Sequence, residues 1–261
     1  MNAIRMPAVF IGHGSPSNVL ENNEFTAAWR DFAASIPRPK AILSISAHWY
    51  TRVTAVTAMA RPPTIHDFGG FPPEMYQLRY PAPGSPELAN EVAKLLAPDE
   101  VYLDHDQWGL DHGTWAVLMH MYPEADIPVV QLSLNGRASN EHHYELAQRL
   151  APLREQGVLV FASGQIVHNL RMTNFSMGKS AYDWALRFEE AVTKTMTTDP
   201  ASVLSLFDHP DYAQASPTPE HFLPLVYLAA LAEDKPAQAL LRDCSLGSSS
   251  LSSYSVGTND M

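Results

Sequence analysis

Four short apolar runs in this chain do not alternate with polar residues, and helical patterns separate them. A strand that is apolar on both faces must be covered on both faces, which is the situation in a parallel sheet flanked by helices. Strand and helix in alternation therefore predict a single α/β domain, residues 1–261, with a mainly parallel or mixed central sheet between helices. The four runs are residues 8–11, 41–46, 127–134 and 158–162.

Three stretches between and after these runs have apolar residues at helical spacing. The first begins at the N-cap Ser85 and extends to about residue 96. The second covers residues 140 to about 154, and we expect His142 and His143 to face solvent on it. The third covers residues 180 to about 196. Residues 247–253 retain enough apolar side chains for a final strand or sheet edge.

Composition excludes several classes of protein. The chain has 28 acidic residues against 17 Lys and Arg, a net charge of −11, whereas nucleic-acid-binding proteins present a basic face. Its single cysteine, Cys244, excludes an internal disulfide and sites built from several thiolates. An uninterrupted apolar run of about 18 residues is missing, so we expect no membrane span and a cytoplasmic location. Monomer and homodimer both remain open.

Histidines follow three of the predicted strands. His13 lies between two glycines after the first strand, His48 follows the second, and His168 lies six residues beyond residue 162. The carboxyl ends of parallel strands lie along one edge of a sheet, where ligands bind. Because imidazole is a common metal ligand, this placement predicts a metal site at the strand carboxyl ends. The alternative for each is an ordinary surface histidine beside a turn.

Other histidines are less informative from position alone. His112 and His221 stand where two further helices are expected to begin, and helix capping is a sufficient explanation of both segments. His66 lies in the segment 61–85, which is rich in proline, glycine and aromatic residues and predicts a structured loop beside a site. The chain lacks a hydrolase nucleophile elbow, a P-loop and an H-E-x-x-H zinc helix, so a site of scattered histidines is the remaining interpretation.

Eight segments carry a resemblance to a known family: GHGSPSNVLE, SISAHWY, PPTIHDFGGFP, YPAPGSP, WGLDHGTW, YPEADIPVVQLSL, VLVFASGQIVHNLR and PTPEHFLPLVYL. They occur in order from residue 7 to about residue 231, and several are long enough to be specific. In them the chain resembles the 4,5-DOPA dioxygenase extradiol family, the bacterial and plant branch of the LigB-type, class III ring-cleaving dioxygenases.

The resemblance implies an enzyme that inserts both atoms of O2 into a small catechol, L-DOPA or a related compound, and forms a muconic semialdehyde. By this resemblance His13, His48 and His221 hold a non-haem metal. His168 is then the acid/base residue and, in some members of the branch, a fourth ligand. His112 is a second active-site histidine, expected to donate a hydrogen bond to bound oxygen or to the developing oxyanion. Fe(II) is expected for activity, because three protein ligands leave positions for catechol and O2, while Zn(II) also fits three imidazoles.

Two alternatives use the same residues. One is a zinc-dependent hydrolase with metal-bound hydroxide as nucleophile and His168 as proton shuttle. The other is a non-catalytic metal- or ligand-binding module. An amino-acid substrate would need a cation for its carboxylate, for which Arg171 is the candidate. The remaining substrate-binding candidate is His66 in the proline-rich loop.

Overall fold

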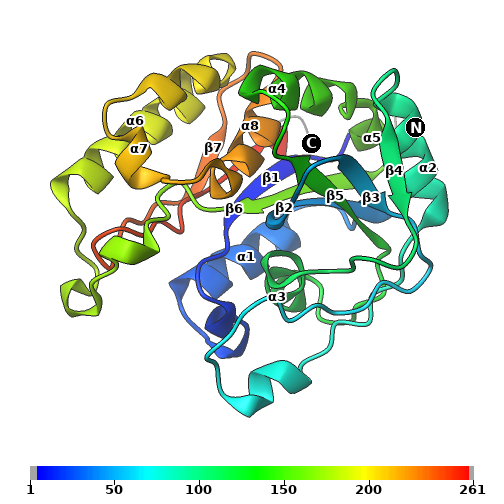
Figure 1. Ribbon diagram of the computed structural model, residues 1–261, viewed down its shortest axis with the longest axis horizontal. Helices are drawn as coiled ribbons and strands as arrows, with labels where there is room; N and C mark the ends of the chain where they lie inside the picture. Colours follow the sequence, from blue (N-terminus) through cyan, green and yellow to red (C-terminus); the bar gives the residue numbers. More distant parts are fainter. Residues whose placement is uncertain (1–4, 259–261) are drawn as a thin grey trace.

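The computed structural model describes residues 5–258, and within them an eight-stranded mixed sheet forms the centre of the fold (Figure 1). Its strand order is β4-β3-β5-β2-β6-β1-β8-β7. The strands are β1 (Ala8–Gly12), β2 (Ala41–Thr51), β3 (Thr54–Thr57), β4 (Val101–Asp104), β5 (Val129–Asn135), β6 (Val158–Gly164), β7 (Gln238–Leu241) and β8 (Ser253–Val256).

The four strands predicted from apolar runs are the four at the centre of this sheet. β2 pairs in parallel with β5 and β6, and β6 pairs in parallel with β1, so β5-β2-β6-β1 is a continuous parallel core. The α/β prediction is therefore confirmed. The outer strands β3, β4 and β7 were not predicted, because four residues are too few to show a clear pattern. β8 and β7 extend the sheet antiparallel beside β1.

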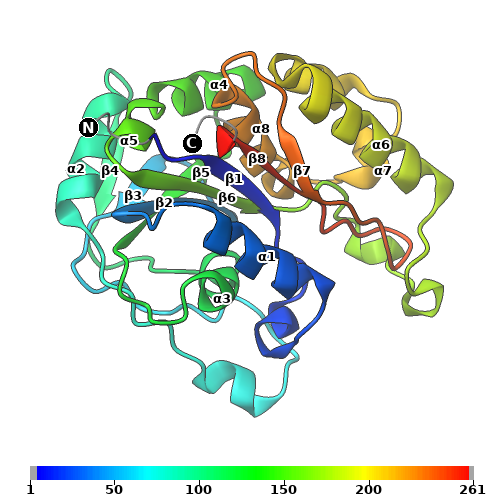
Figure 2. The same ribbon diagram turned by 180° about the vertical axis from the view of Figure 1, so that it is seen from behind.

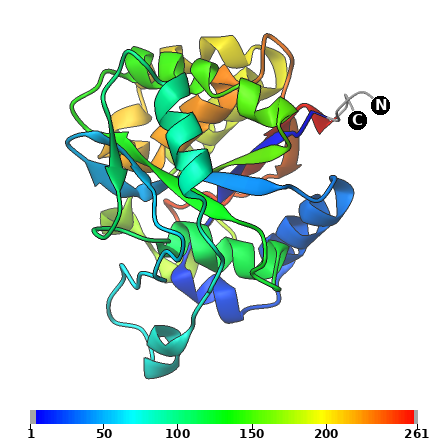
Figure 3. The same ribbon diagram turned by 90° about the vertical axis from the view of Figure 1, so that its right-hand side faces the viewer.

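Helices cover both faces of the sheet, as the two opposite views in Figures 1 and 2 show. α1 and α3 lie against one face, and α4 and α8 lie against the other, so in Figure 3 the sheet is seen between two helical layers. The α-helices are α1 (Glu24–Ser35), α2 (Pro86–Leu95), α3 (His112–Met121), α4 (Asn140–Arg149), α5 (Pro152–Glu155), α6 (Asp183–Thr198), α7 (Tyr212–Ala215) and α8 (Leu223–Ala230). The 3-10 helices are η1 (Pro16–Leu20), η2 (Pro73–Gln77), η3 (Leu170–Met172), η4 (Phe175–Met177), η5 (Pro200–Asp208) and η6 (Pro219–His221).

The helix predicted over residues 140–154 differs from the structure in two respects. It is divided into α4 and α5, and the break precedes Pro152, which has no N–H to continue the hydrogen-bond ladder. The expectation that His143 faces solvent is wrong, because α8 covers this side of α4 and His143 is buried. Its Nε2–H donates to Asn135 O at 3.1 Å, and its Nδ1 accepts from Tyr227 Oη at 3.0 Å. None of the helices among the described residues is long and apolar enough to cross a bilayer.

Candidate metal centre

Five histidines gather around one cavity at the carboxyl edge of the parallel core. The cavity has a volume of about 790 Å³. The ring centre of His13 lies 5.0 Å from that of His48, 5.5 Å from His112 and 5.5 Å from His221. His168 stacks on His221 with ring centres 3.5 Å apart. The structure thus brings together the histidines singled out at strand ends and the two at expected helix starts.

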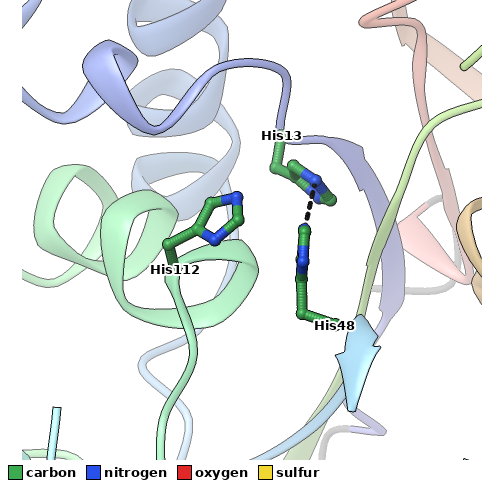
Figure 4. Close-up of side chains that lie close together, drawn as sticks. All are labelled: His13, His48 and His112. Atoms are coloured by element: carbon green, nitrogen blue, oxygen red, sulfur yellow. Dashed lines mark hydrogen bonds between the residues drawn. The ribbon is translucent and has the colours of Figure 1, made fainter. Parts of the chain in front are cut away.

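Local backbone features direct His13 and His48 into the cavity. His13 follows β1 directly and precedes Gly14, whose φ of 64° lies in the left-handed region that favours glycine. His48 lies within the long strand β2, where the register against β5 shifts between Ile45 and Tyr50. Such a bulge re-aims side chains at the rim of a sheet. In Figure 4 the rings of His13, His48 and His112 point toward one another.

A hydroxyl group determines which nitrogen of His13 carries the proton. Ser163 Oγ lies 2.6 Å from Gly113 O, which can only accept, so the single hydroxyl proton of Ser163 is used in that bond. Ser163 Oγ must therefore accept the hydrogen bond from His13 Nδ1 at 2.9 Å. A neutral His13 is then unprotonated at Nε2, which faces His48 Nε2 at 3.1 Å (Figure 4).

Asp67 is shared by His48 and His112. Its Oδ2 lies 3.1 Å from His48 Nδ1 and 2.9 Å from His112 Nδ1, and its Oδ1 accepts from the backbone N–H of His112 at 2.9 Å. Burial would raise the pKa of Asp67, but the hydrogen bonds from His112 and His48 outweigh it and lower that pKa well below its ordinary value. Asp67 is thus a carboxylate that accepts hydrogen bonds from the Nδ1–H groups of both rings. Sequence reasoning missed it, although it lies in the proline-rich segment expected beside a site.

The hydrogen bond to Asp67 also limits what His112 can do. Burial and the neighbouring His48 lower the pKa of His112, which favours its neutral form. A neutral His112 with its proton on Nδ1 can only accept at Nε2. The donor role expected for His112 therefore does not fit the neutral ring.

His221 reaches the cavity because η6 packs closely against the end of β6. The backbone N–H of Gln165 donates to His221 O at 2.9 Å. A Cβ on Gly164 would lie only 2.2 Å from that carbonyl oxygen, so this approach requires glycine. Glu220 Oε1 accepts a hydrogen bond from His221 Nδ1–H at 3.3 Å, so a neutral His221 is unprotonated at Nε2.

The donor set fits a transition-metal ion. Three of the rings donate a hydrogen bond from Nδ1–H to an oxygen atom: those of His13, His48 and His221. This arrangement orients histidine ligands at metal sites. The Nε2 atoms of His13 and His48 lie 3.1 Å apart. Two unprotonated nitrogens at this distance repel, so a cation must lie against both. Burial lowers the pKa of His48, but the hydrogen bond to Asp67 and the negative charges of Asp111, Asp67 and Glu220 together raise that pKa. The cation is therefore either a proton on His48 or a metal ion that displaces it.

Potential ligand atoms form two adjacent groups, each with its atoms within 4.8 Å of one another. One group contains His13, His48 and His112. The other contains His168, Glu220 and His221. The His13–His48 pair thus shares its group with His112, whereas the ring centre of His221 lies 5.0 Å from that of His48 and 5.5 Å from that of His13.

The two substrate-binding candidates do not line the cavity wall. Arg171 is exposed on η3 and is not among the residues that line the cavity. The cation that lines it is Lys179, whose Nζ lies 2.6 Å from Glu24 Oε1. His66 packs behind Phe68, a lining residue, with ring centres 5.7 Å apart.

Comparison with known proteins gives concordant matches. A family model described as the catalytic LigB subunit of aromatic ring-opening dioxygenase matches residues 6–257. The chain is similar to proteins named 4,5-DOPA dioxygenase extradiol from Escherichia coli strain K12, at 47% identity over 98% of this chain and 97% of that protein, and from Beta vulgaris, at 40% identity over 94% of each. The crystal structure of an uncharacterized Escherichia coli K12 protein matches with a TM-score of 0.85 at 42% identity, covering 97% of this chain and 100% of that chain.

Proposed function

Because this chain belongs to the family of catalytic LigB subunits of aromatic ring-opening dioxygenases, it is an extradiol dioxygenase with a non-haem metal, and we propose that it cleaves L-DOPA or a related small catechol to a muconic semialdehyde. The observation that carries the proposal is the cluster of five histidines around one cavity. The names of the relatives support this substrate class. They give no support to a zinc hydrolase or a binding module.

We propose His13, His48 and His221 as the metal ligands. Their unprotonated Nε2 atoms, and the oxygen acceptors that hold their Nδ1–H groups, support all three as ligands. His112 has the same two features through Asp67, and it is the family resemblance that places His112 outside the ligands. We propose Fe(II) as the active metal, which when bound supplies a common site for catechol and O2 and a path for electrons between them.

We propose His168 as the base that accepts a proton from a catechol hydroxyl. Burial lowers its pKa to about 4, so at neutral pH the ring is uncharged and can accept a proton. Its stacking on His221 holds the ring beside the proposed ligands. His112 offers a second acceptor on the other side of the histidine cluster, through its Nε2.

The cavity lining supports a catechol that carries a charged tail. Phe68 and Phe71 supply apolar wall against which an aromatic ring can pack. Lys179 supplies a cation for a carboxylate, in place of the expected Arg171. We therefore expect Lys179→Gln to raise KM for L-DOPA while leaving KM for 4-methylcatechol, which has no carboxylate, unchanged.

Oxygen uptake tests the proposal. Protein stripped of metal is reconstituted with Fe(II) or with Zn(II) and assayed with a panel of catechols. Uptake with Fe(II) alone, together with a yellow ring-opened product, is the expected result, because zinc has no redox chemistry with which to activate oxygen. Absence of uptake with either metal would refute the dioxygenase proposal.

A further inference from the structure

We propose that Asp67 is a positioning residue that places the proton of both His48 and His112 on Nδ1, so that one carboxylate directs the Nε2 of a metal ligand and of its neighbour into the cavity. The inference rests on the proposed function for the identity of the ligand. Its physical basis is the set of hydrogen bonds that Asp67 accepts.

The loop that carries Asp67 is held in place by backbone contacts a few residues earlier. Leu110 N–H donates to Pro63 O at 2.9 Å, and Ile65 N–H donates to Leu110 O at 2.7 Å. Trp115 Nε1–H, from α3, donates to Ile65 O at 2.8 Å. α3 also begins with His112, so the same helix fixes both the loop and one of the rings that Asp67 contacts. The backbone two residues before Asp67 is therefore tied to the same helix that carries His112.

The contacts of Asp67 require a carboxylate. It accepts from three donors: Nδ1 of His48, Nδ1 of His112 and the backbone N–H of His112. Its side chain is 12% exposed, which leaves little water to replace a lost acceptor. An asparagine would present one oxygen and one NH2 group to these three N–H donors. With its NH2 group toward the rings, the rings would have to rotate or move their protons to Nε2, the atom that must be unprotonated to bind metal. With its NH2 group toward α3, the asparagine would face the backbone N–H of His112, which would lose its acceptor.

Both rings depend on the same oxygen. His48 and His112 have ring centres 4.0 Å apart, and Oδ2 lies within hydrogen-bond reach of each. Hydrogen bonds from a histidine ligand to a carboxylate fix the ring orientation and raise the basicity of the ligating nitrogen, and their loss costs about 10–100-fold in metal affinity or activity. We therefore expect Asp67 to affect metal binding through His48 and turnover through His112.

The test compares Asp67→Asn with Asp243→Asn. Asp243 lines the same cavity but accepts from Ser245 Oγ and the Leu251 N–H, so its substitution removes an equal charge without touching a histidine. Zinc affinity is measured by competition with a chromogenic chelator, and folding by circular dichroism. We expect about 10–100-fold weaker binding for Asp67→Asn and unchanged binding for Asp243→Asn. Wild-type affinity in Asp67→Asn, or an equal loss in Asp243→Asn, would overturn the proposal.

A second measurement uses the unmodified protein and does not depend on how a variant folds. In zinc-loaded, 15N-labelled protein, proton–nitrogen correlation spectra report which ring nitrogen carries the proton. We expect Nδ1–H for both His48 and His112, and Nε2–H on either ring would overturn the proposal. Neither measurement uses oxygen or a catechol, so a failure of the dioxygenase assignment would be seen separately, as absent oxygen uptake.

Discussion

The Gly164→Ala variant tests whether the close approach of η6 to the end of β6 places His221 in the cavity. In Gly164→Ala the new Cβ would lie 2.2 Å from His221 O, whereas a carbon–oxygen contact needs about 3.3 Å. The carbonyl must therefore move by about 1 Å, and its hydrogen bond from Gln165 N–H, now 2.9 Å, is strained or lost. Overpacking costs about 1–3 kcal/mol, and an unsatisfied buried backbone group costs about 1–3 kcal/mol. We expect a total loss of about 2–6 kcal/mol in the free energy of unfolding.

Thermal unfolding, metal binding and turnover are measured for the variant. At about 2–4 °C per kcal/mol for a chain of this size, the lower limit of that loss corresponds to a decrease of at least about 4 °C in Tm. Displacement of His221 by about 1 Å is expected to reduce turnover by about 100-fold. Gly69→Ala is the matched control, because Gly69 lines the same cavity and its Cβ would meet nothing within 4 Å. Wild-type Tm and metal affinity in Gly164→Ala would refute the reasoning.

Three further predictions concern the metal and the buried histidines. His221→Ala is expected to lower metal content more than His112→Ala, measured by atomic absorption; the reverse order would make His112 the third ligand. Removal of metal with a chelator is expected to abolish oxygen uptake, and recovery with Zn(II) instead of Fe(II) would contradict the proposed cofactor. Burial lowers the pKa of His143 from 6.5 to about 4, so between these values the unfolded chain binds a proton that the folded protein does not. This contribution to stability is present above pH 6.5 and decreases as pH falls, by about 2–3 kcal/mol at pH 4.5. Chemical denaturation at pH 7 and pH 4.5 measures how much the free energy of unfolding decreases between these values, and we expect a smaller decrease for His143→Gln than for the wild type. Equal decreases would count against a buried neutral His143.

The centre of the fold could be predicted because its signal is local. Each strand of the parallel core is an apolar run that can be recognised without knowledge of its neighbours, and strand topology implies that the carboxyl ends share an edge. His13 and His48 lie in or directly after such strands, so their meeting follows from the topology. The short strands β3, β4 and β7 have no such signal, since their pairing partners stabilise them more than their own residues do.

The amino-acid sequence by itself determined the α/β architecture, the edge of the sheet where a site forms, and the kinds of side chain available there. Tertiary structure decided which of those side chains meet and which nitrogen each histidine presents. Asp67 and His112 are 45 residues apart, and His143 and Tyr227 are 84 residues apart, so neither hydrogen bond leaves a trace in a local pattern. Periodicity shows which face of an element is apolar, whereas proton positions and ligand geometry depend on partners that only the folded chain brings within 3 Å.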